Sequence, residues 1–204
     1  MKCYRCPSHD VRENLALEEK LFRSTTGDML LLWQNEPCIV IGKHQVAEAE
    51  VLPEILQEGH LPVVRRITGG GAVYHDLGNL NFSFLTDDIS RTYMDFLNPV
   101  IQALEKFHVH AVYNERNDLL VEGKKISGNA QLVAGNRMLH HGTLLFDTDL
   151  ERLGQVLQPH PEKLARNEVS SVTARVGNLK DMIPDKQVTL EQIAQAIVDV
   201  VGEL

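Results

Sequence analysis

The sequence predicts an α+β domain in which a mixed, mostly antiparallel sheet is flanked by helices. Two observations support this prediction. Strand-like segments separated by short turn signals fill much of the chain, and segments with helical spacing of apolar residues stand between them and at both ends. The chain has 204 residues, enough for one domain with its own core. Because no repeat and no linker interrupts it, we expect residues 1–204 to form a single domain.

The first half of the chain is expected to alternate helices with short strands. Residues 11–24 place large apolar side chains on one broad face, which indicates an amphipathic helix. "LNFSFL" (80–85) alternates apolar and polar residues, which is typical of a strand with one buried face. The turn signal at 76–79 predicts a hairpin between 72–75 and 80–85. The other expected elements are strands at 29–34, 38–42 and 62–68 and a helix at 48–60.

The second half is richer in strands and ends in a helix. Apolar residues at helical spacing predict a helix over 92–107, where Pro99 marks a kink or a new first turn. Strands are expected at 109–113, 119–122, 125–133 and 138–147, and helices at 149–157 and 189–204.

The overall charge and the cysteine content exclude several classes of protein. The chain has 20 Lys and Arg against 28 Asp and Glu, and a net charge of −8 disfavours nucleic acid as a partner. No segment approaches the ~18–20 apolar residues of a membrane span. The start, "MKCYRCPSHD", lacks the apolar core of a secretory signal. With only three cysteines, these features predict a cytoplasmic protein with no membrane partner.

The stretch "RRITGGG" (65–71) places two arginines before three consecutive glycines. Ordering each glycine costs roughly 0.5–1 kcal/mol more than ordering alanine, so this segment needs bare backbone. A tight turn is one explanation. The other is close approach of an anionic ligand to backbone N–H groups, with an arginine as a permanently charged donor to phosphate. The pattern matches neither GxxxxGK[ST] nor GxGxxG, so those phosphate-binding mechanisms do not transfer.

A second candidate segment surrounds the lysine pair of "GKKISGNAQ" (123–131). A solvated lysine in a turn is an ordinary finding. Beside an anion-binding loop, however, a lysine at a strand edge can neutralise charge that develops on a phosphate or carbonyl oxygen. Just upstream, Asn117 and Asp118 have two explanations: a turn pair, or ligands for a substrate or for Mg²⁺.

Histidine and cysteine pairs suggest metal sites, but their spacing disfavours this. His140 and His141 are adjacent, so on a strand they point to opposite faces and do not share one metal. We expect one of them to face a pocket and the other to lie at the surface. Cys3 and Cys6 form a C-x-x-C pair without a second ligand pair, which favours ordinary cysteines over a metal or redox site.

Three motifs, taken in their order, resemble those of the lipoate–protein ligase A family. They are "RRITGGGAVYHDLGN", "NDLLVEGKKISGNAQ" and "HHGTLLF". The helix near 14–22 and the stretch 170–184 are similar too, so the resemblance covers essentially the whole chain. It implies the fold that this family shares with biotin protein ligases and, more distantly, with class II aminoacyl-tRNA synthetases. That fold agrees with the predicted elements.

The resemblance also implies an enzyme that uses ATP, Mg²⁺ and lipoate. In the family's reaction, lipoate attacks the α-phosphate of ATP, which gives lipoyl-adenylate and pyrophosphate. The ε-amine of a lysine on a lipoyl domain then takes the lipoyl group. The implied acceptors are E2 subunits of 2-oxoacid dehydrogenases or the H protein of the glycine cleavage system.

The same resemblance implies roles for individual residues. Lys125 falls on the family's catalytic lysine, which would contact both the phosphate and the acyl carbonyl, and Lys124 is the competing assignment. Nucleotide would be held by Arg66 and by the backbone from Gly71 to Tyr74. The full set of implied binding residues is Arg66, Gly70, Gly71, Ala72, Val73, Tyr74, His75, Asp118, Lys125 and His141.

The chain departs from the family's pattern at its C-terminal end. Typical members carry a smaller C-terminal accessory domain, and this sequence ends soon after its last expected helix. In the family, that domain supports adenylate formation more than transfer. We therefore expect efficient transfer from preformed lipoyl-adenylate, and slow activation of lipoate unless a separate polypeptide supplies the accessory domain.

Other functions stay open beside the ligase. One is a transfer-only lipoyl or octanoyl transferase, and another is a non-catalytic lipoate-binding subunit of a split ligase. A transferase that works through an acyl-cysteine needs a cysteine in its pocket, and no cysteine follows Cys38. A biotin ligase is disfavoured because "RRITGGG" stands where a "GRGRxG"-like loop would be expected.

Overall fold

The protein is described by a computed structural model, which covers residues 1–114, 117–157 and 175–202. Its longer sheet contains β1 (Lys2–Arg5), β2 (Met29–Trp33), β6 (Asn79–Thr86), β7 (Val112–Tyr113), β8 (Asp118–Val121), β9 (Lys124–Ala134) and β10 (Arg137–Leu145). Its shorter sheet contains β3 (Cys38–Ile41), β4 (Val63–Arg65) and β5 (Val73–His75). The helices are α1 (Val11–Ser24), α2 (Ala47–Glu50), α3 (Pro53–Glu58), α4 (Tyr93–Glu105), α5 (Leu150–Val156), α8 (Leu179–Met182) and α9 (Leu190–Gly202).

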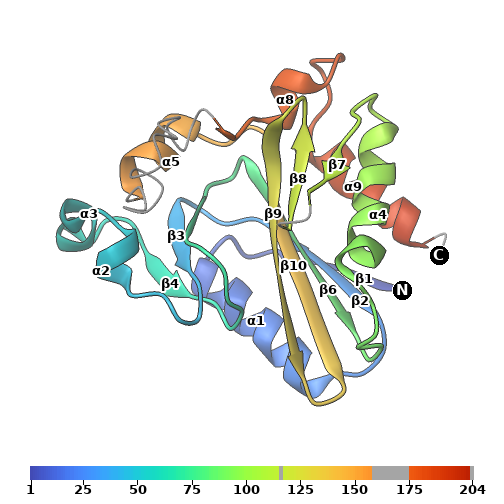
Figure 1. Ribbon diagram of the computed structural model, residues 1–204, viewed down its shortest axis with the longest axis horizontal. Coiled ribbons are helices and arrows are strands. Elements are labelled where there is room, and N and C mark those ends of the chain that lie inside the picture. Colours follow the sequence, from blue (N-terminus) through green and yellow to red (C-terminus); the bar gives the residue numbers. More distant parts are fainter. Residues whose placement is uncertain (115–116, 158–174, 203–204) are drawn as a thin grey trace.

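Both sheets are mixed, and antiparallel pairs predominate, as the sequence predicts. The strand orders are β1-β2-β6-β10-β9-β8-β7 and β4-β3-β5. Among the strands described, the pairs β1–β2 and β3–β4 are parallel and the others are antiparallel. In Figure 1 the shorter sheet lies to the left of the longer one, with α2 and α3 beyond it. The predicted α+β class is therefore confirmed.

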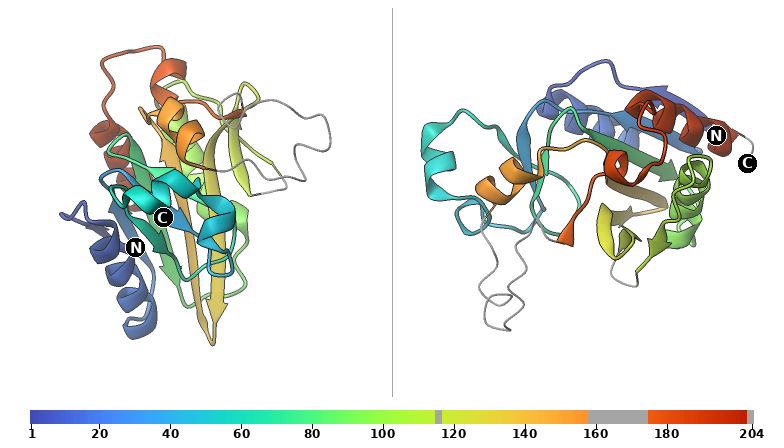
Figure 2. Two further views of the ribbon diagram at one scale, coloured as in Figure 1. Left: turned by 90° about the vertical axis from the view of Figure 1, so that its left-hand side faces the viewer. Right: turned by 90° about the horizontal axis from the view of Figure 1, so that it is seen from above.

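One face of the longer sheet packs against α4 and α9. Phe82 and Phe84 of β6 form a buried cluster there with Phe96 of α4 and Ile197 of α9. Figures 1 and 2 place these two helices side by side on this face. A capping box at Thr92 starts α4, because its hydroxyl and the Asp95 carboxylate satisfy free N–H groups of the first turn. We call this side of the sheet the core face.

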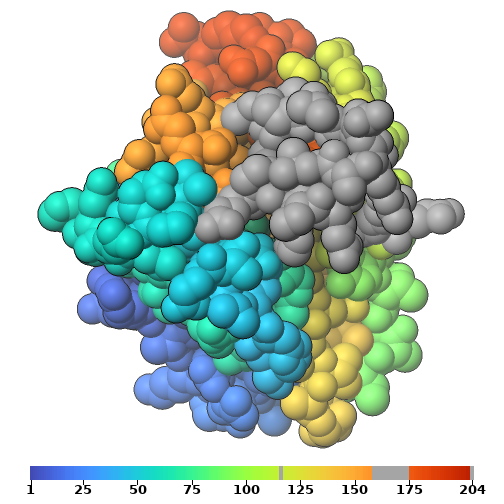
Figure 3. Space-filling view, turned by 60° about the vertical axis from the view of Figure 1, so that its left-hand side comes forward, coloured from blue at the N-terminus to red at the C-terminus, as the bar shows by residue number. Residues whose placement is uncertain are grey.

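The opposite face of the longer sheet is covered by α1 and the shorter sheet. Leu15 of α1 packs there with Leu31, Trp33 and Val40. Asp10 caps α1, since its carboxylate accepts hydrogen bonds from backbone N–H groups of the first turn. Figure 3 shows the α2–α3 segment beside α5, and a cluster of apolar side chains that includes Val51, Ile55 and Leu153 joins them. We call this side of the sheet the site face.

The predicted hairpin between 72–75 and 80–85 is wrong. The chain does turn at 76–79, where the N–H of Asn79 donates to the Asp76 carbonyl at 3.1 Å. The flanking strands then enter different sheets: β5 pairs with β3, and β6 lies between β2 and β10. The eight residues of β6 are all buried, so their backbone groups need long partner strands. β10 and β2 supply more pairing than the three-residue β5 could.

Burial on both sides of β6 also corrects the prediction of a half-buried strand. Asn81 and Ser83, which were expected to face outward, are 1% and 0% exposed. The predicted helix at 48–60 is also two helices, since Pro53 starts α3 after Leu52 has left helical geometry. The other predicted helices and strands are confirmed within a few residues, apart from positions 203–204 and part of 170–184, which lie outside the described residues. No helix in the described ranges is long and apolar enough to cross a bilayer.

Candidate active site

The three glycines after β4 form a loop that Arg66 holds from its inner side. Its buried guanidinium donates from Nη2 to the carbonyls of Gly69 at 2.7 Å and Gly71 at 2.8 Å. Its Nε donates to the Thr68 hydroxyl at 3.0 Å. Burial lowers the pKa of Arg66 to about 10, and the Glu18 carboxylate opposes that shift. In this structure Arg66 thus uses its donors on the backbone of the loop itself.

The inward carbonyls decide where the N–H groups of the loop point. In a trans peptide, the C=O of one residue and the N–H of the next lie on opposite sides of the chain. Because the carbonyls of Gly69 and Gly71 point at Arg66, the N–H groups of Gly70 and Ala72 point away from it. Neither N–H group has a hydrogen-bond partner among the described residues. Outward, unpaired N–H groups of this kind form concave sites for anions.

The glycines around the loop serve different purposes. Gly70 has φ +93°, and a Cβ on it would lie 2.8 Å from Nη2 of Arg66. A Cβ on Gly42, just after β3, would collide with the Gly70 carbonyl, so the close approach of these two backbones requires Gly42. A Cβ on Gly71 would meet nothing within 4 Å. The loop therefore packs against Gly42 and is open at Gly71. Sequence reasoning did not identify Gly42.

A series of buried hydrogen bonds supports the loop from the site face of the sheet. The Thr68 hydroxyl lies 2.7 Å from Nε2 of His141, and Nδ1 of His141 lies 2.9 Å from Oε1 of Glu18. The same carboxylate oxygen accepts from the Ser83 hydroxyl at 2.5 Å. Ser83 in turn accepts from Nε1 of Trp33 at 3.0 Å. Of these residues, only His141 was predicted for the site. Glu18 had no signal beyond its place in a predicted helix.

His75 forms a second buried connection, between β5 and β10. Its Nδ1 lies 3.0 Å from Nδ2 of Asn35, and its Nε2 lies 3.1 Å from the Thr143 hydroxyl. Thr143 donates its own proton to Asn81 at 2.8 Å, so Nε2 of His75 carries a hydrogen and Nδ1 accepts. Complete burial lowers the pKa of His75 to about 3, and the positive charge of Arg66 adds to the shift. His75 is thus a neutral residue that joins the two sheets.

Tyr74 contributes packing rather than an accessible hydroxyl. Its side chain is 3% exposed and lies in an apolar cluster with Ile39 and Ile41. Burial raises its pKa to about 12. Ala72 and Val73, which precede it, are half-buried.

Lys125 and Asp118 form an ion pair at the far edge of the site face. Nζ of Lys125 lies 2.7 Å from Oδ1 of Asp118, and the two side chains are 38% and 20% exposed. A Cβ on Gly128 would lie 2.9 Å from that Nζ, so glycine leaves the space the lysine occupies. Asn114 donates to the second oxygen of Asp118 at 3.3 Å. The ammonium is held in place yet remains reachable from solvent.

A β-bulge puts Lys125 on the site face. The register pairs Leu119 with Ser127 and Leu120 with Lys125, so Ile126 is an extra residue in β9. In a regular strand Lys125 and Ser127 would share a face. With the bulge, Ser127 and Ile126 are both buried on the core side, and Lys125 turns toward Asp118.

The competing residue, Lys124, has different surroundings. A Cβ on Gly177 would lie 3.0 Å from Cδ of Lys124, so the aliphatic stem of this lysine runs over Gly177. The backbone there is also fixed, since the N–H of Gly177 donates to the Lys125 carbonyl at 3.0 Å. No partner for the Lys124 ammonium is found in the part of the chain that the structure describes.

Strands β9 and β10 separate the glycine loop from the lysine. Thr143 of β10 contacts His75 and pairs with Gly128 of β9, beside which Lys125 lies. Two strand spacings amount to roughly 10 Å. Within the described residues, no hydrogen bond joins Lys125 or Asp118 to the loop. The structure thus brings the loop, His75 and His141 into one group, and Lys125 with Asp118 into another on the same face.

The segment after His75 in the first motif has a structural role. The Asp76 carboxylate accepts from the N–H groups of Gly78 and Asp149, both at 2.8 Å. A Cβ on Gly78 would collide with the backbone of Asp147. "DLGN" (76–79) therefore anchors the turn that leads from β10 into α5.

His140 corrects the prediction that one histidine of the pair lies at the surface. It is 0% exposed and stacks on Phe96, with ring centroids 4.8 Å apart. Gln131 lies 3.0 Å from its Nδ1, and its Nε2 has no hydrogen-bond partner among the residues that the structure describes. Burial lowers its pKa to about 3. Both histidines are buried because both faces of β10 are covered.

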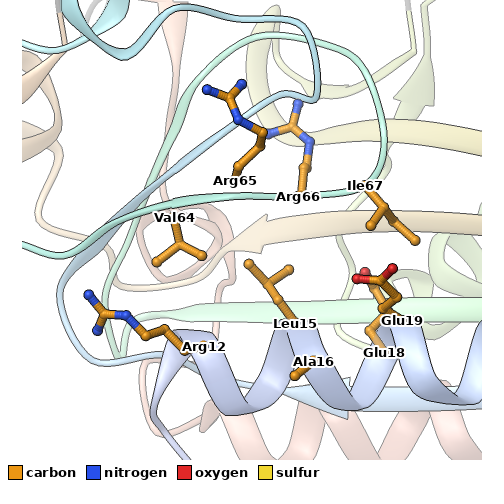
Figure 4. A pocket seen from close by; sticks show the side chains of 9 residues that line it. All are labelled: Arg12, Leu15, Ala16, Glu18, Glu19, Val64, Arg65, Arg66 and Ile67. Atoms are coloured by element: carbon orange, nitrogen blue, oxygen red, sulfur yellow. The ribbon is translucent and has the colours of Figure 1, made fainter.

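A small cavity lies between α1 and β4, on the α1 side of the segment that carries Arg65 and Arg66 (Figure 4). Val64 and Ile67 point into it, whereas the side chains of Arg65 and Arg66 point away from α1. Its volume is about 180 Å³. Pockets for drug-sized ligands usually reach about 300–1,000 Å³, so we assign this cavity no ligand.

Cysteine and metal chemistry have little support in the described residues. Burial raises the pKa of Cys38 to about 12, so its thiol stays protonated and unreactive. Cys3 and Cys6 are free thiols. No group of three or more His, Cys, Asp or Glu side chains in the described ranges could hold a metal ion. The remaining features, an open N–H cradle and a reachable ammonium, suit an anionic group beside a polarised carbonyl.

Comparison with known proteins gives a consistent result. The family model "Lipoyl protein ligase A/B catalytic domain" matches residues 10–202. Lipoate-protein ligase LplJ of Bacillus subtilis is 42% identical over 188 residues, which is 90% of this chain and 57% of that protein. The chain thus spans little more than half the length of this relative.

Solved structures extend the comparison. A bi-partite lipoate protein ligase from Thermoplasma acidophilum matches with TM-score 0.84 and 32% identity, over 99% of this chain and 82% of that one. A lipoate-protein ligase A bound with ATP matches with TM-score 0.83 and 28% identity, over 99% and 83%. Biotin protein ligase from Aquifex aeolicus, with TM-score 0.53 and 13% identity over 100% and 68%, shares the fold alone.

Proposed function

The chain belongs to the lipoyl protein ligase A/B catalytic domain family, and from that premise we propose that it takes part in ATP-dependent lipoylation of proteins. The observation that carries the proposal is the glycine loop, whose carbonyls are held inward by Arg66 while the N–H groups of Gly70 and Ala72 face outward unpaired. Such a cradle suits the phosphate of an adenylate.

The proposed reaction has two steps. In the first, a carboxylate oxygen of lipoate bonds to the α-phosphorus of ATP, and the bond from that phosphorus to the bridging oxygen breaks, releasing pyrophosphate. In the second, the amine of an acceptor lysine bonds to the acyl carbon, the mixed anhydride breaks, AMP leaves and the amine loses a proton. We assign Lys125 to stabilise charge on the phosphate and on the acyl oxygen in these steps. Its exposed ammonium and its place on the site face support this role.

Arg66 has a different role in this proposal from the one expected of it. Its guanidinium is directed at the loop carbonyls, so we propose that it shapes the nucleotide cradle rather than contacting phosphate directly. His75 and His141, which also lie below the loop, are proposed to support the site from within the sheet.

ATP and lipoate are proposed substrates, supported by the ligase relatives and by the matched ATP-bound structure. Mg²⁺ belongs to the proposal as the ion that accompanies ATP. The described residues offer it no ligand cluster, so we route no step through it. Lipoyl domains of E2 subunits or of glycine cleavage H protein are the proposed acceptors, and one matched structure concerns a ligase together with its E2 lipoyl domain.

Transfer without activation is a second candidate function, because that same matched ligase is bi-partite. Transfer starts from an anhydride that is already activated and needs only positioning and charge stabilisation at the carbonyl. Activation also requires that departing pyrophosphate be held and neutralised. We propose that residues 1–204 transfer efficiently by themselves and that a second component, as in the bi-partite relative, accelerates activation.

Mass spectrometry of an apo lipoyl domain tests both candidates. One reaction contains the chain, lipoate and Mg·ATP, and a parallel reaction contains the chain and preformed lipoyl-adenylate, with pyrophosphate release followed in the first. Lipoylation in both reactions identifies a complete ligase, and lipoylation in the second alone identifies transfer only. If neither reaction modifies the domain, and the chain nevertheless binds lipoate, the protein is a binding subunit and the enzymatic proposal fails.

A further inference from the structure

We propose that Glu18 is a positioning residue for the glycine loop, acting through His141 and Thr68. The inference deepens the proposed function, since the loop matters only if it holds an adenylate. Glu18 lies on α1 and is 1% exposed. Within the described residues it makes no hydrogen bond to the loop, and its hydrogen bonds reach the loop through His141 and Thr68.

The hydrogen bonds between Glu18 and the loop all run in one direction. A carboxylate only accepts, so Nδ1 of His141 must carry the hydrogen that it shares with Glu18. In the neutral imidazole, the other ring nitrogen, Nε2, then accepts from the Thr68 hydroxyl. Thr68 in turn accepts from Nε of Arg66. The carboxylate at the end of the series thus sets the direction of each hydrogen bond in it.

The last hydrogen bond of the series, from Nε of Arg66 to Thr68, helps to fix the plane of the guanidinium. With Nε directed at Thr68, the neighbouring Nη2 is directed at the carbonyls of Gly69 and Gly71. Those carbonyls in turn set the outward N–H groups. Without the Thr68 hydroxyl, the guanidinium would keep its charge and its bonds to the carbonyls of Val40, Gly69 and Gly71, but Nε would lose its shorter contact.

Glu18 is suited to this role by its burial and its second partner. The same oxygen, Oε1, accepts from His141 and from Ser83, and Ser83 is itself held by Trp33 of β2. The carboxylate is therefore fixed from two strands at once. It also supplies the negative charge that favours the buried Arg66 cation. Neither feature would be needed for packing α1 alone, which an apolar side chain at position 18 would achieve.

Two variants break the series at different points. Glu18→Ala removes its end. Thr68→Val removes the central hydroxyl but keeps the size and the branching of the side chain. Thr68→Ser restores the hydroxyl and serves as the rescue variant. Glu13→Gln is the matched control, since Glu13 is an exposed carboxylate of the same helix that contacts Ser8 and nothing of the loop.

Two measurements separate positioning from simple folding. Calorimetry with a non-hydrolysable acyl-adenylate analogue gives affinity, and ¹⁵N NMR of the ligand-free chain gives the order parameters of the Gly70, Gly71 and Ala72 amides. We expect Thr68→Val and Glu18→Ala to weaken binding about tenfold or more and to lower these order parameters. Thr68→Ser and Glu13→Gln should match the parent chain in both measurements.

The outcomes are distinguishable. Parent-like affinity and loop order in Thr68→Val overturn the inference, whether or not Glu18→Ala folds. A loss that Thr68→Ser fails to restore also overturns it, because the hydroxyl is then not the cause. If the parent chain does not bind the analogue, the proposed function fails. The NMR comparison, which needs no ligand, then decides the inference by itself.

Discussion

His140 and His141 are neighbours in β10, yet they lie in opposite environments. His140 is on the core face among aromatic rings, and burial lowers its pKa to about 3. In the described part of the chain its Nε2 has no hydrogen-bond partner. His141 is on the site face, and each of its nitrogens has a polar partner. One residue type thus serves as a packing ring in one position and as a hydrogen-bond link in the next.

The difference extends over both faces of the longer sheet. The core face carries Phe82 and Phe84 and packs on helices. The site face carries Ser83, Thr143 and Lys125 and meets the shorter sheet and its glycine loop. Changes on the core face should therefore alter stability, and changes on the site face should alter activity. The predictions below test this division, from the largest effect to the smallest.

On the core face, Phe96→Ala should give the largest loss of stability. The ring is 1% exposed and stacks on His140, so its removal leaves a cavity in the aromatic cluster. Such truncations cost about 3–5 kcal/mol of unfolding free energy. Urea denaturation measures this cost, with the exposed Val112→Ala as the control. Activity per folded molecule should not change, and a loss below about 1 kcal/mol would contradict the assignment of Phe96 to the core.

On the site face, Lys125→Ala should reduce both lipoyl transfer and adenylation about 10²–10³-fold, as expected when one electrostatic donor is lost. Stability should hardly change, because the Asp118 pair is partly exposed. Lys124→Ala is the matched control, since its stem runs over Gly177 on another side of the strand. Single-turnover rates from lipoyl-adenylate measure the effect. Equal behaviour of the two variants would show that the bulge does not select between the lysines.

Acid should weaken the fold through the buried histidines. His140 and His75 have pKa values lowered to about 3, against about 6.5 in the unfolded chain. The unfolded state therefore binds more protons below pH 6.5, so stability is full above that value and falls as the pH drops toward 3. Each histidine should cost about 2 kcal/mol between pH 7 and pH 5. Unfolding free energies at both pH values measure this, and His140→Phe should reduce the difference by about half. If His140→Phe left this difference in unfolding free energy unchanged, the assignment of His140 as a buried, neutral residue would be wrong.

Within the glycine loop, alanine at Gly70 and at Gly71 should have different effects. Gly70 has a positive φ and faces Arg66, so Gly70→Ala strains the loop by about 1–3 kcal/mol. Gly71→Ala meets nothing within 4 Å and should change stability by no more than about 0.5 kcal/mol. Bulkier Gly71→Val should still weaken binding of an acyl-adenylate analogue, because the side chain fills the open side. Calorimetry and thermal unfolding separate the two effects, and normal affinity of Gly71→Val would exclude close approach of ligand.

The regular elements could be predicted from the sequence because their signals are local. The face of α1 and the length of β9 follow from periodicity within the segments themselves. The partner of β5 could not be predicted, since pairing with β3 rather than with β6 depends on residues far away in the chain. The polar residues of β6 looked solvent-facing because alternation does not reveal a second layer above them.

Some residues of the candidate site could be proposed from the sequence for the same reason. The glycine run and Lys125 stand out because each lies in a short stretch of unusual composition: two arginines before three glycines, and two lysines after a glycine. Glu18 and Gly42 carry no such signal: one is an ordinary helix carboxylate, and the other is a glycine after a strand. Their places in the candidate site depend on contacts with Ser83, His141 and the Gly70 carbonyl, which only the tertiary structure brings near.

The extra residue in β9 has a consequence for how this strand tolerates length changes. Side chains along a strand alternate between its two faces, and the extra residue Ile126 interrupts that alternation. Deleting Ile126 would leave Ser127 and Lys125 on opposite faces, so Lys125 would stay on the site face although the strand is one residue shorter. Deleting Gly128 instead would move every residue of β9 before it to the opposite face, and Lys125 would then lie on the core face. Ile126 is thus the position in the motif "KKISGN" at which the chain could lose a residue while Lys125 keeps its face.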